Sequence, residues 1–149
     1  MKQFRLFPAI VAGIAGTAVM SVMMAIAPMM GLPPMNVPSM LSNFMGMPLF
    51  LGWVMHFMVG SILAVQYAAF ASSRLPGPPV LRGMLFGLAP WLMAQVIVNP
   101  MMGAGVFAMN AAAPVGMVMG SLLGHLVFGA VIGKLYAFGK ENIPLSVHA

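Results

Sequence analysis

The chain has 149 residues, of which 62% are hydrophobic and only 5% are charged. A soluble domain carries about 25% charged residues, so this composition excludes a soluble enzyme, a nucleic-acid-binding domain and a disordered linker. The net charge is +5, but the basic residues form no run of the kind that binds a phosphate backbone. The absence of Cys excludes disulfides and thiolate metal sites.

Four apolar segments are long enough to cross a bilayer, for which about 20 residues are needed. They cover approximately residues 7–30, 48–71, 83–102 and 115–138. The loops between them are too short to hold another domain, so we predict that residues 1–149 form a single all-α domain, a polytopic membrane four-helix bundle. The first segment resembles a signal peptide, but its apolar run exceeds the usual length of about 7–15 residues, and we predict a retained helix.

The basic side chains predict the orientation of these spans. All six fall on one side of the membrane, namely Lys2, Arg5, Arg74, Arg82, Lys134 and Lys140. The other two loops, residues 31–47 and 103–114, contain no charged residue. Because positively charged segments stay cytoplasmic, we predict a multi-pass protein of the bacterial inner (plasma) membrane with both termini cytoplasmic. Lys134 lies near the end of its span, where its side chain can extend to the headgroups.

The first outer loop contains the pattern of a short amphipathic helix. Asn36 is placed to cap its N-terminus, Pro38 suits its first turn and Gly46 suits its C-terminus. Apolar residues follow helical spacing at Val37, Met40, Leu41, Phe44 and Met45. We predict that this helix lies in the outer interface, with a position over the mouth of the bundle as the alternative.

The second and fourth spans match each other at a constant offset, which is 69 residues between His56 and His125. The matched positions are Gly52, His56, Gly60, Ala64 and Ala68 with Ser121, His125, Gly129, Gly133 and Ala137. The first and third spans both end in Pro-Met-Met-Gly, at Pro28 and Pro100. We therefore predict two tandem two-helix hairpin repeats, related by a pseudo-twofold axis along the membrane normal.

Small and polar residues within the spans predict the surfaces along which the helices meet, because small side chains let helix backbones approach in lipid. The predicted inward-facing residues are Thr17, Ser21, Gly60, Gln95, Asn99, Ser121 and Gly129. A further glycine face, formed by Gly116, Gly120 and Gly124, is predicted to remain free for a partner.

No Asp or Glu occurs in any span, which argues against a proton-driven exporter, because such a protein needs an ionisable group inside the membrane. Three interpretations of His56 and His125 stay open. Each neutral imidazole can bond across helices to Gln95, Asn99, Thr17 or Ser21. The pair can ligate one b-type haem. Together with neighbouring thioethers they can bind copper. The methionines predicted for that site are Met55, Met58, Met117 and Met119.

Five segments carry a resemblance to a known family. They are APMMGLPPM at 27–35, GWVMHFM at 52–58, LPGPP at 75–79, RGM at 82–84 and PMMGAG at 100–105. These segments are similar to those of a family of small bacterial four-span inner-membrane proteins of unknown function. The resemblance covers approximately residues 7–138. It implies the four-span architecture and assigns no activity, cofactor or site residue.

Three classes of function remain open. The favoured one is a non-catalytic accessory or assembly subunit of a larger membrane complex, such as a redox complex. The alternatives are an outer-facing copper or b-type haem binding protein using Met and His, and a small transporter or channel whose path follows the polar residues. We predict no enzymatic activity and no nucleic-acid partner. The predicted partners are the lipid bilayer and either other membrane subunits or a second copy of the chain.

Overall fold

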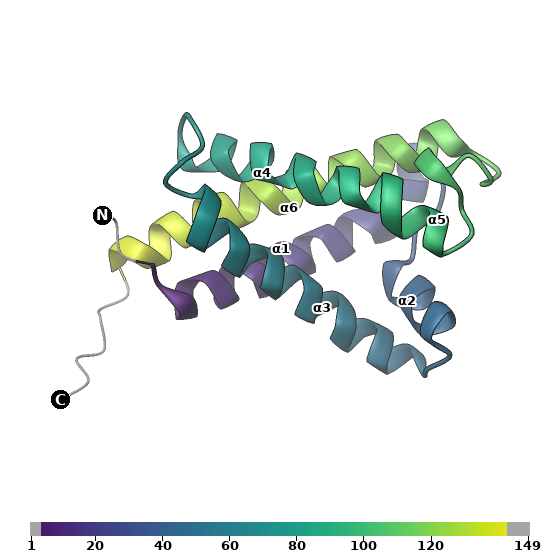
Figure 1. The fold of residues 1–149 in the computed structure, drawn as a ribbon, viewed down its shortest axis with the longest axis horizontal. Helices are drawn as coiled ribbons and strands as arrows, with labels where there is room; N and C mark the ends of the chain where they lie inside the picture. Colours follow the sequence, from purple (N-terminus) through teal and green to yellow (C-terminus); the bar gives the residue numbers. More distant parts are fainter. Residues whose placement is uncertain (1–3, 143–149) are drawn as a thin grey trace.

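The computed structural model describes residues 4–142 (Figure 1). Within that range the elements are α1 (Leu6–Ile26), η1 (Ala27–Met30), α2 (Val37–Met45), α3 (Leu49–Gln66), η2 (Tyr67–Ala71), α4 (Pro79–Met93), η3 (Ala94–Val98), α5 (Asn99–Met101), η4 (Val106–Ala108) and α6 (Pro114–Asn142). Four continuous helical stretches are long and apolar enough to cross a membrane: Leu6–Met30, Leu49–Ala71, Pro79–Met101 and Pro114–Asn142. The predicted all-α fold with four spans is confirmed.

Proline and glycine account for most of the helix boundaries. Pro79 and Pro114 occupy the first position of α4 and α6, where a missing N–H costs nothing. The third span therefore begins four residues before the predicted Gly83. Gly31 ends the first span with φ of 80°, a left-handed conformation that glycine adopts without steric strain.

The four long helices are arranged in the order α3, α1, α6, α4, with extended contacts between each neighbouring pair. In Figure 1 the beginning of α1, the end of α6 and the α3–α4 connection lie at one end of the molecule, while α2 and α5 lie at the other. We call the first of these the basic end, because it carries Arg5, Arg74, Arg82 and Lys140, and we call the second the neutral end. Helices α3 and α4 come together near the basic end and diverge toward the neutral end (Figure 1).

The half of the bundle near the basic end, here the closed half, is held together by backbone contacts at glycine. Gly83 and Gly129 lie against each other's carbonyl groups, and a methyl group on Gly87 would lie 2.5 Å from the carbonyl oxygen of His125. Helices α1 and α3 meet similarly, because a methyl group on Gly13 would lie 2.7 Å from the Cα atom of Ser61. Such close approach favours helix association in lipid.

Aromatic side chains complete the closed half. The ring of Tyr67 lies 5.5 Å from that of Phe86 and 6.2 Å from that of Tyr136, both edge to face. The Tyr67 hydroxyl donates to the carbonyl oxygen of Pro79 at 3.4 Å, and the Arg5 backbone N–H donates to the Tyr136 hydroxyl at 3.3 Å. This cluster fastens η2 to the beginning of α4 and α6 to the beginning of α1.

Helix α2 has the capping predicted from the sequence. The Asn36 side chain accepts a hydrogen bond from the Ser39 backbone N–H at 3.0 Å, and Gly46 has a φ of 64°. The helix packs against α3, with the Pro38 carbonyl on Gly52. It therefore covers the mouth of the bundle, which was the alternative placement. Its last three residues, Asn43, Phe44 and Met45, are exposed.

Two segments of π-helix interrupt the long helices, and the sequence analysis did not anticipate either. In η2 the Ser72 N–H donates to the Tyr67 carbonyl, five residues earlier. In η3 the Asn99 N–H donates to the Ala94 carbonyl in the same way. The second segment ends two residues before Pro100, which has no N–H to continue the ordinary hydrogen-bond pattern of the helix. Each π turn adds a residue to the helical register and rotates the next turn of the helix about its axis.

The predicted free glycine face is covered by the chain itself. Gly116 lies against Pro33, Gly120 against Met35 and Gly124 against Met20. The expectation that this face is available to a partner was wrong, because the path of the first outer loop over α6 could not be read from helical spacing. The internal repeat stays a sequence prediction. If a twofold axis related the two hairpins, α4 would pack on α3 as α1 packs on α6. Within residues 4–142 there is no such extended contact between α4 and α3.

Candidate functional site: a methionine-lined cavity

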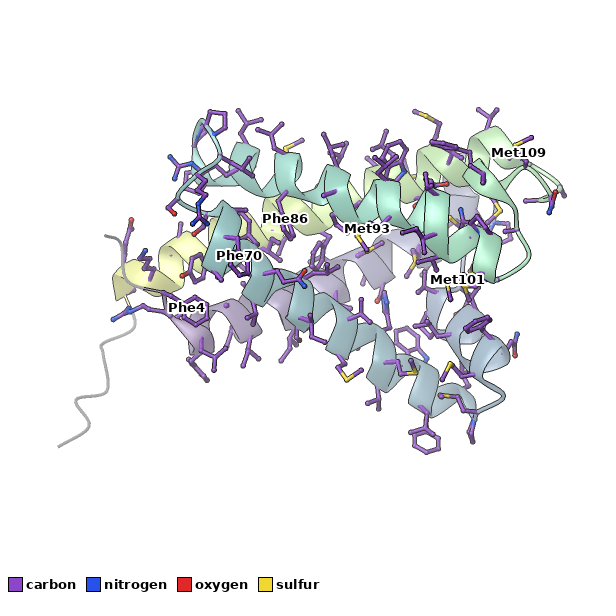
Figure 2. All side chains as sticks on the ribbon, in the orientation of Figure 1. Phe4, Phe70, Phe86, Met93, Met101 and Met109 are labelled. Carbon is purple, nitrogen blue, oxygen red and sulfur yellow. The ribbon has the colours of Figure 1, made fainter. Side chains whose placement is uncertain are left out.

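The divergence of α3 and α4 leaves a cavity of about 330 Å³ in the half of the bundle near the neutral end, here the open half. All four long helices and the segment around α2 contribute to its lining. Figure 2 shows the labelled Met93 in the gap between α4 and α3. Its side chain lines the cavity and is 58% exposed, so the cavity has an opening on this flank. Phe128, Gly60 and Leu63 line the cavity where it meets the closed half.

The polar residues of the spans meet at this cavity. Those that line it are Thr17, His56, Gln95, Asn99, Ser121 and His125. Two of the predicted packing residues lie elsewhere in the described chain. Ser21 donates to the Thr17 carbonyl at 2.8 Å without lining the cavity, and Gly129 packs on Gly83 in the closed half. Gly60 lines the cavity and lies against the Thr17 hydroxyl.

His125 is held in one orientation by its own helix. Its Nδ1 atom lies 2.8 Å from the carbonyl oxygen of Ser121, one turn earlier in α6. A carbonyl can only accept, so Nδ1 carries the proton, and in the neutral ring Nε2 then has the lone pair. Because His125 lines the cavity, this nitrogen is the basic site that the ring can offer to a ligand.

His56 faces the same cavity from α3. The residue is 7% exposed, and its buried Nε2 atom has no hydrogen-bond partner among the described residues. A buried polar atom without a partner typically costs about 1–3 kcal/mol. The ring centroids of Trp53 and Phe57 lie 6.3 Å and 6.1 Å from the centroid of the His56 ring, each pair in an edge-to-face arrangement. Both imidazoles line the same cavity.

The hydrogen bonds predicted between the imidazoles and neighbouring helices are absent from the described part of the chain. Gln95 instead donates from Nε2 to the Ser121 hydroxyl at 3.2 Å and accepts from Asn99 Nδ2 at 3.0 Å. Thr17 donates to the Gly13 carbonyl of its own helix at 2.8 Å. These polar groups satisfy one another, which leaves Nε2 of His56 unpaired.

Methionine is the most frequent residue type around the cavity. The described methionines that line it are Met20, Met24, Met35, Met40, Met93, Met102 and Met117. Of the four methionines predicted beside the histidines, Met117 is in this set. Met58 and Met119 are instead 50% and 53% exposed on the outer surface of the helices, and Met55 is partly buried outside the cavity lining.

The cavity lining contains no charged side chain. Within residues 4–142, no three His, Cys, Asp or Glu side chains come together in a group that could hold a metal ion. The basic residues lie elsewhere and bond to backbone carbonyls. Arg5 donates to Lys140 at 2.8 Å, Arg74 to Phe70 at 2.7 Å and Arg82 to Ser72 at 2.9 Å. Lys134 is exposed on α6. The predicted anchor Lys2 lies outside the described residues.

Four apolar helices around an uncharged cavity define a multi-pass membrane protein built as a helical bundle. The chain belongs to a family of unknown function (DUF6789), whose model matches residues 5–144. This confirms the resemblance drawn from the sequence to an uncharacterised family. Neither a curated protein nor a solved structure matches the chain.

Proposed function

We propose that this protein is an intramembrane binding protein, which receives a small ligand in the methionine-lined cavity from the neutral end. The observation that carries the proposal is the cavity itself, about 330 Å³ in volume, mainly apolar and with six polar side chains converging on it. Ligand sites in proteins are commonly clefts of about 300–1,000 Å³ with this combination of apolar walls and a few polar groups.

The distribution of charge supports access from outside the cell. The basic end carries Arg5, Arg74, Arg82 and Lys140, whereas the loops at the neutral end carry no charge. The positive-inside rule then assigns the basic end to the cytoplasm. The cavity opens in the outer half under this orientation, beneath α2 and along the gap between α3 and α4.

The closed half argues for binding rather than passage. A route to the basic end would have to cross the buried cluster that contains Phe128, Ile132 and Tyr67, none of them more than 2% exposed. It would also have to separate the glycine contacts between α4 and α6. The transporter or channel considered from the sequence therefore receives less support than a binding site that is closed toward the basic end.

The accessory-subunit role favoured from the sequence is a separate prediction. The covered glycine face removes one of the surfaces that suggested a partner. Extraction in mild detergent tests it directly, because an assembly subunit co-migrates with its complex, while migration alone argues against the role.

Cysteine labelling tests the proposed cavity, since the natural chain contains no Cys. In Ser121→Cys the thiol replaces a hydroxyl that lines the cavity. We expect a small, membrane-impermeant thiol reagent to label it from the outer side and not from the cytoplasmic side. Met119→Cys is the matched control on the same helix, because its exposed position faces lipid and a thiol in hydrocarbon does not ionise.

A second pair of substitutions tests whether the labelled space is the cavity. Ala94→Trp introduces a large ring into the lining and should reduce labelling of Ser121→Cys at least tenfold, whereas Ala89→Trp lies on the exposed face of α4 and should leave it unchanged. Labelling from both sides would favour a transporter. Failure to label from either side would reject the proposed access.

A further inference from the structure

We propose that the cavity binds a soft monovalent metal ion, Cu(I), through the Nε2 atoms of His56 and His125 and a methionine thioether. The inference rests on the proposed function, because the ion must reach the cavity from the neutral end. It names the ligand that the donor atoms of this cavity suit best.

The hydrogen bond of His125 is of the kind that accompanies metal ligation. A metal-binding histidine usually donates its second ring N–H to a carbonyl or carboxylate, which fixes the ring and leaves the other nitrogen for the metal. His125 donates from Nδ1 to the Ser121 carbonyl at 2.8 Å. Its Nε2 lone pair is therefore already in the form that a metal requires.

His56 supplies the second donor and an independent observation. Its side chain is more than nine-tenths buried, lines the cavity and has an Nε2 atom without a partner in the described chain. A metal ion between the two rings gives this nitrogen a partner. Both rings line the same cavity, which contains no carboxylate that would favour a protonated imidazole.

The methionines select the kind of metal. Thioether and imidazole are soft or intermediate donors that suit Cu(I), whereas carboxylates and thiolates, which stabilise most divalent ions, are absent from the lining. The terminal methyl carbon of Met20 lies against Gly124, the residue before His125, and Met20 lines the same cavity as both imidazoles. A single positive charge is also the least costly to place among neutral groups.

Further thioethers lead from the mouth of the cavity to the histidines. Met35 and Met40 lie in the segment that covers the mouth, and Met102 follows α5 at the neutral end. Met117 lies two turns before His125 in α6. A Cu(I) ion can exchange from one sulfur to the next without a charged ligand, and the route ends where Phe128 and Gly60 meet the closed half.

A b-type haem fits these surroundings less well. Haem carries two propionate groups, which need basic partners or water when a bilayer surrounds the ring. No Lys or Arg lines the cavity, and the loops at the neutral end have none. An iron-containing protein with a haem absorption spectrum would therefore contradict the inference.

The test is Cu(I) binding by the purified full-length protein in lipid nanodiscs, measured by competition with a chromogenic Cu(I) chelator under reducing conditions. We expect one Cu(I) per chain, with X-ray absorption showing nitrogen and sulfur neighbours. His56→Ala and His125→Ala should each weaken binding more than about 100-fold, while metal-free thermal unfolding confirms that the variants remain folded.

Two triple variants provide a matched test of the thioethers. Replacing Met20, Met93 and Met117 by Leu removes three sulfurs from the cavity and should weaken binding at least tenfold. Replacing Met55, Met58 and Met119 by Leu removes three sulfurs outside the lining and should have no effect. The inference is wrong if the two triple variants behave alike, or if the histidine variants bind as the natural protein does.

The outcomes also separate this inference from the proposed function. A protein whose Ser121→Cys variant is labelled from the outer side, but which binds no Cu(I), retains the cavity and loses the metal. If the Ser121→Cys variant is not labelled, both the proposed function and the Cu(I) site are rejected.

Discussion

The two halves of the bundle are packed by opposite means. In the closed half, glycine lets backbones touch, as Gly83 does with Gly129, and rigid aromatic rings occupy the remaining space. In the open half, flexible methionine side chains surround a space that they do not fill. The comparison teaches that the tightest packing and the open space lie in different halves of the bundle. The proposed binding site is in the loosely packed half, as expected of a region that must admit a ligand.

The largest expected effect comes from adding a methyl group in the closed half. In Gly129→Ala the new carbon meets the Gly83 carbonyl and lies 3.1 Å from the Met84 Cα atom, so two backbones must separate. We expect a loss of about 3 kcal/mol in the free energy of unfolding. Denaturant titration of the protein in mixed micelles, followed by circular dichroism, measures it.

The matched change in the open half is Gly120→Ala. There the new carbon meets the Met35 terminal methyl at 2.8 Å, and a methionine end can move aside. A loss below about 1 kcal/mol is expected. Equal losses for the two glycine variants would show that the halves are packed alike.

A smaller effect is expected from the aromatic cluster. Tyr67→Leu keeps an apolar side chain but removes the edge-to-face contacts with Phe86 and Tyr136. Such contacts are typically worth about 1 kcal/mol, and the lost hydrogen bond to the Pro79 carbonyl adds about 1 kcal/mol. The same titration should therefore show a loss of about 2 kcal/mol. Phe70→Leu is the control, since the Phe70 ring lies in the same π segment and is 64% exposed. If Phe70→Leu lowered the free energy of unfolding by a comparable amount, rings on the outer surface would contribute as much stability as the buried aromatic cluster.

The smallest effect is expected at the wall of the cavity. Ser121→Ala removes the acceptor of the Gln95 hydrogen bond, and interhelical hydrogen bonds in membranes contribute about 0.6 kcal/mol on average. The backbone carbonyl that holds His125 is unchanged. Ser61→Ala serves as the comparison, because the Ser61 hydroxyl donates within its own helix to Phe57 at 2.8 Å. No measurable difference between the variants would indicate that the Gln95 bond adds no stability.

The secondary-structure elements were predicted better from the sequence than the contacts between them. Span length gave four helices, and four-residue spacing correctly placed Gly52, His56, Gly60 and Ala64 on one buried face of α3. Asn36, Pro38 and Gly46 gave the limits of α2. These features are local, so helical geometry and capping are enough to predict them.

The composition of the cavity could not be predicted in the same way. Met58 and Met119 are two and six residues from a histidine, yet helical geometry turns both away from the cavity. Met20 and Met93 belong to other helices and reach it through tertiary packing. The π segment at Ala94–Val98 changes the register that places Gln95 and Asn99, and nothing in a hydrophobic pattern signals an extra residue in a turn.

Helix α6 is longer than a bilayer is thick. Its 29 residues span about 44 Å, whereas the hydrocarbon core measures about 30 Å. The helix must tilt or extend into the headgroup region, and a thinner bilayer requires more of either. Since His125 is carried by this helix and His56 by α3, we expect a tilt of α6 relative to α3 to change the separation of the two rings. Bilayer thickness then becomes a variable of the proposed site, which lipids of different chain length adjust without changing a residue.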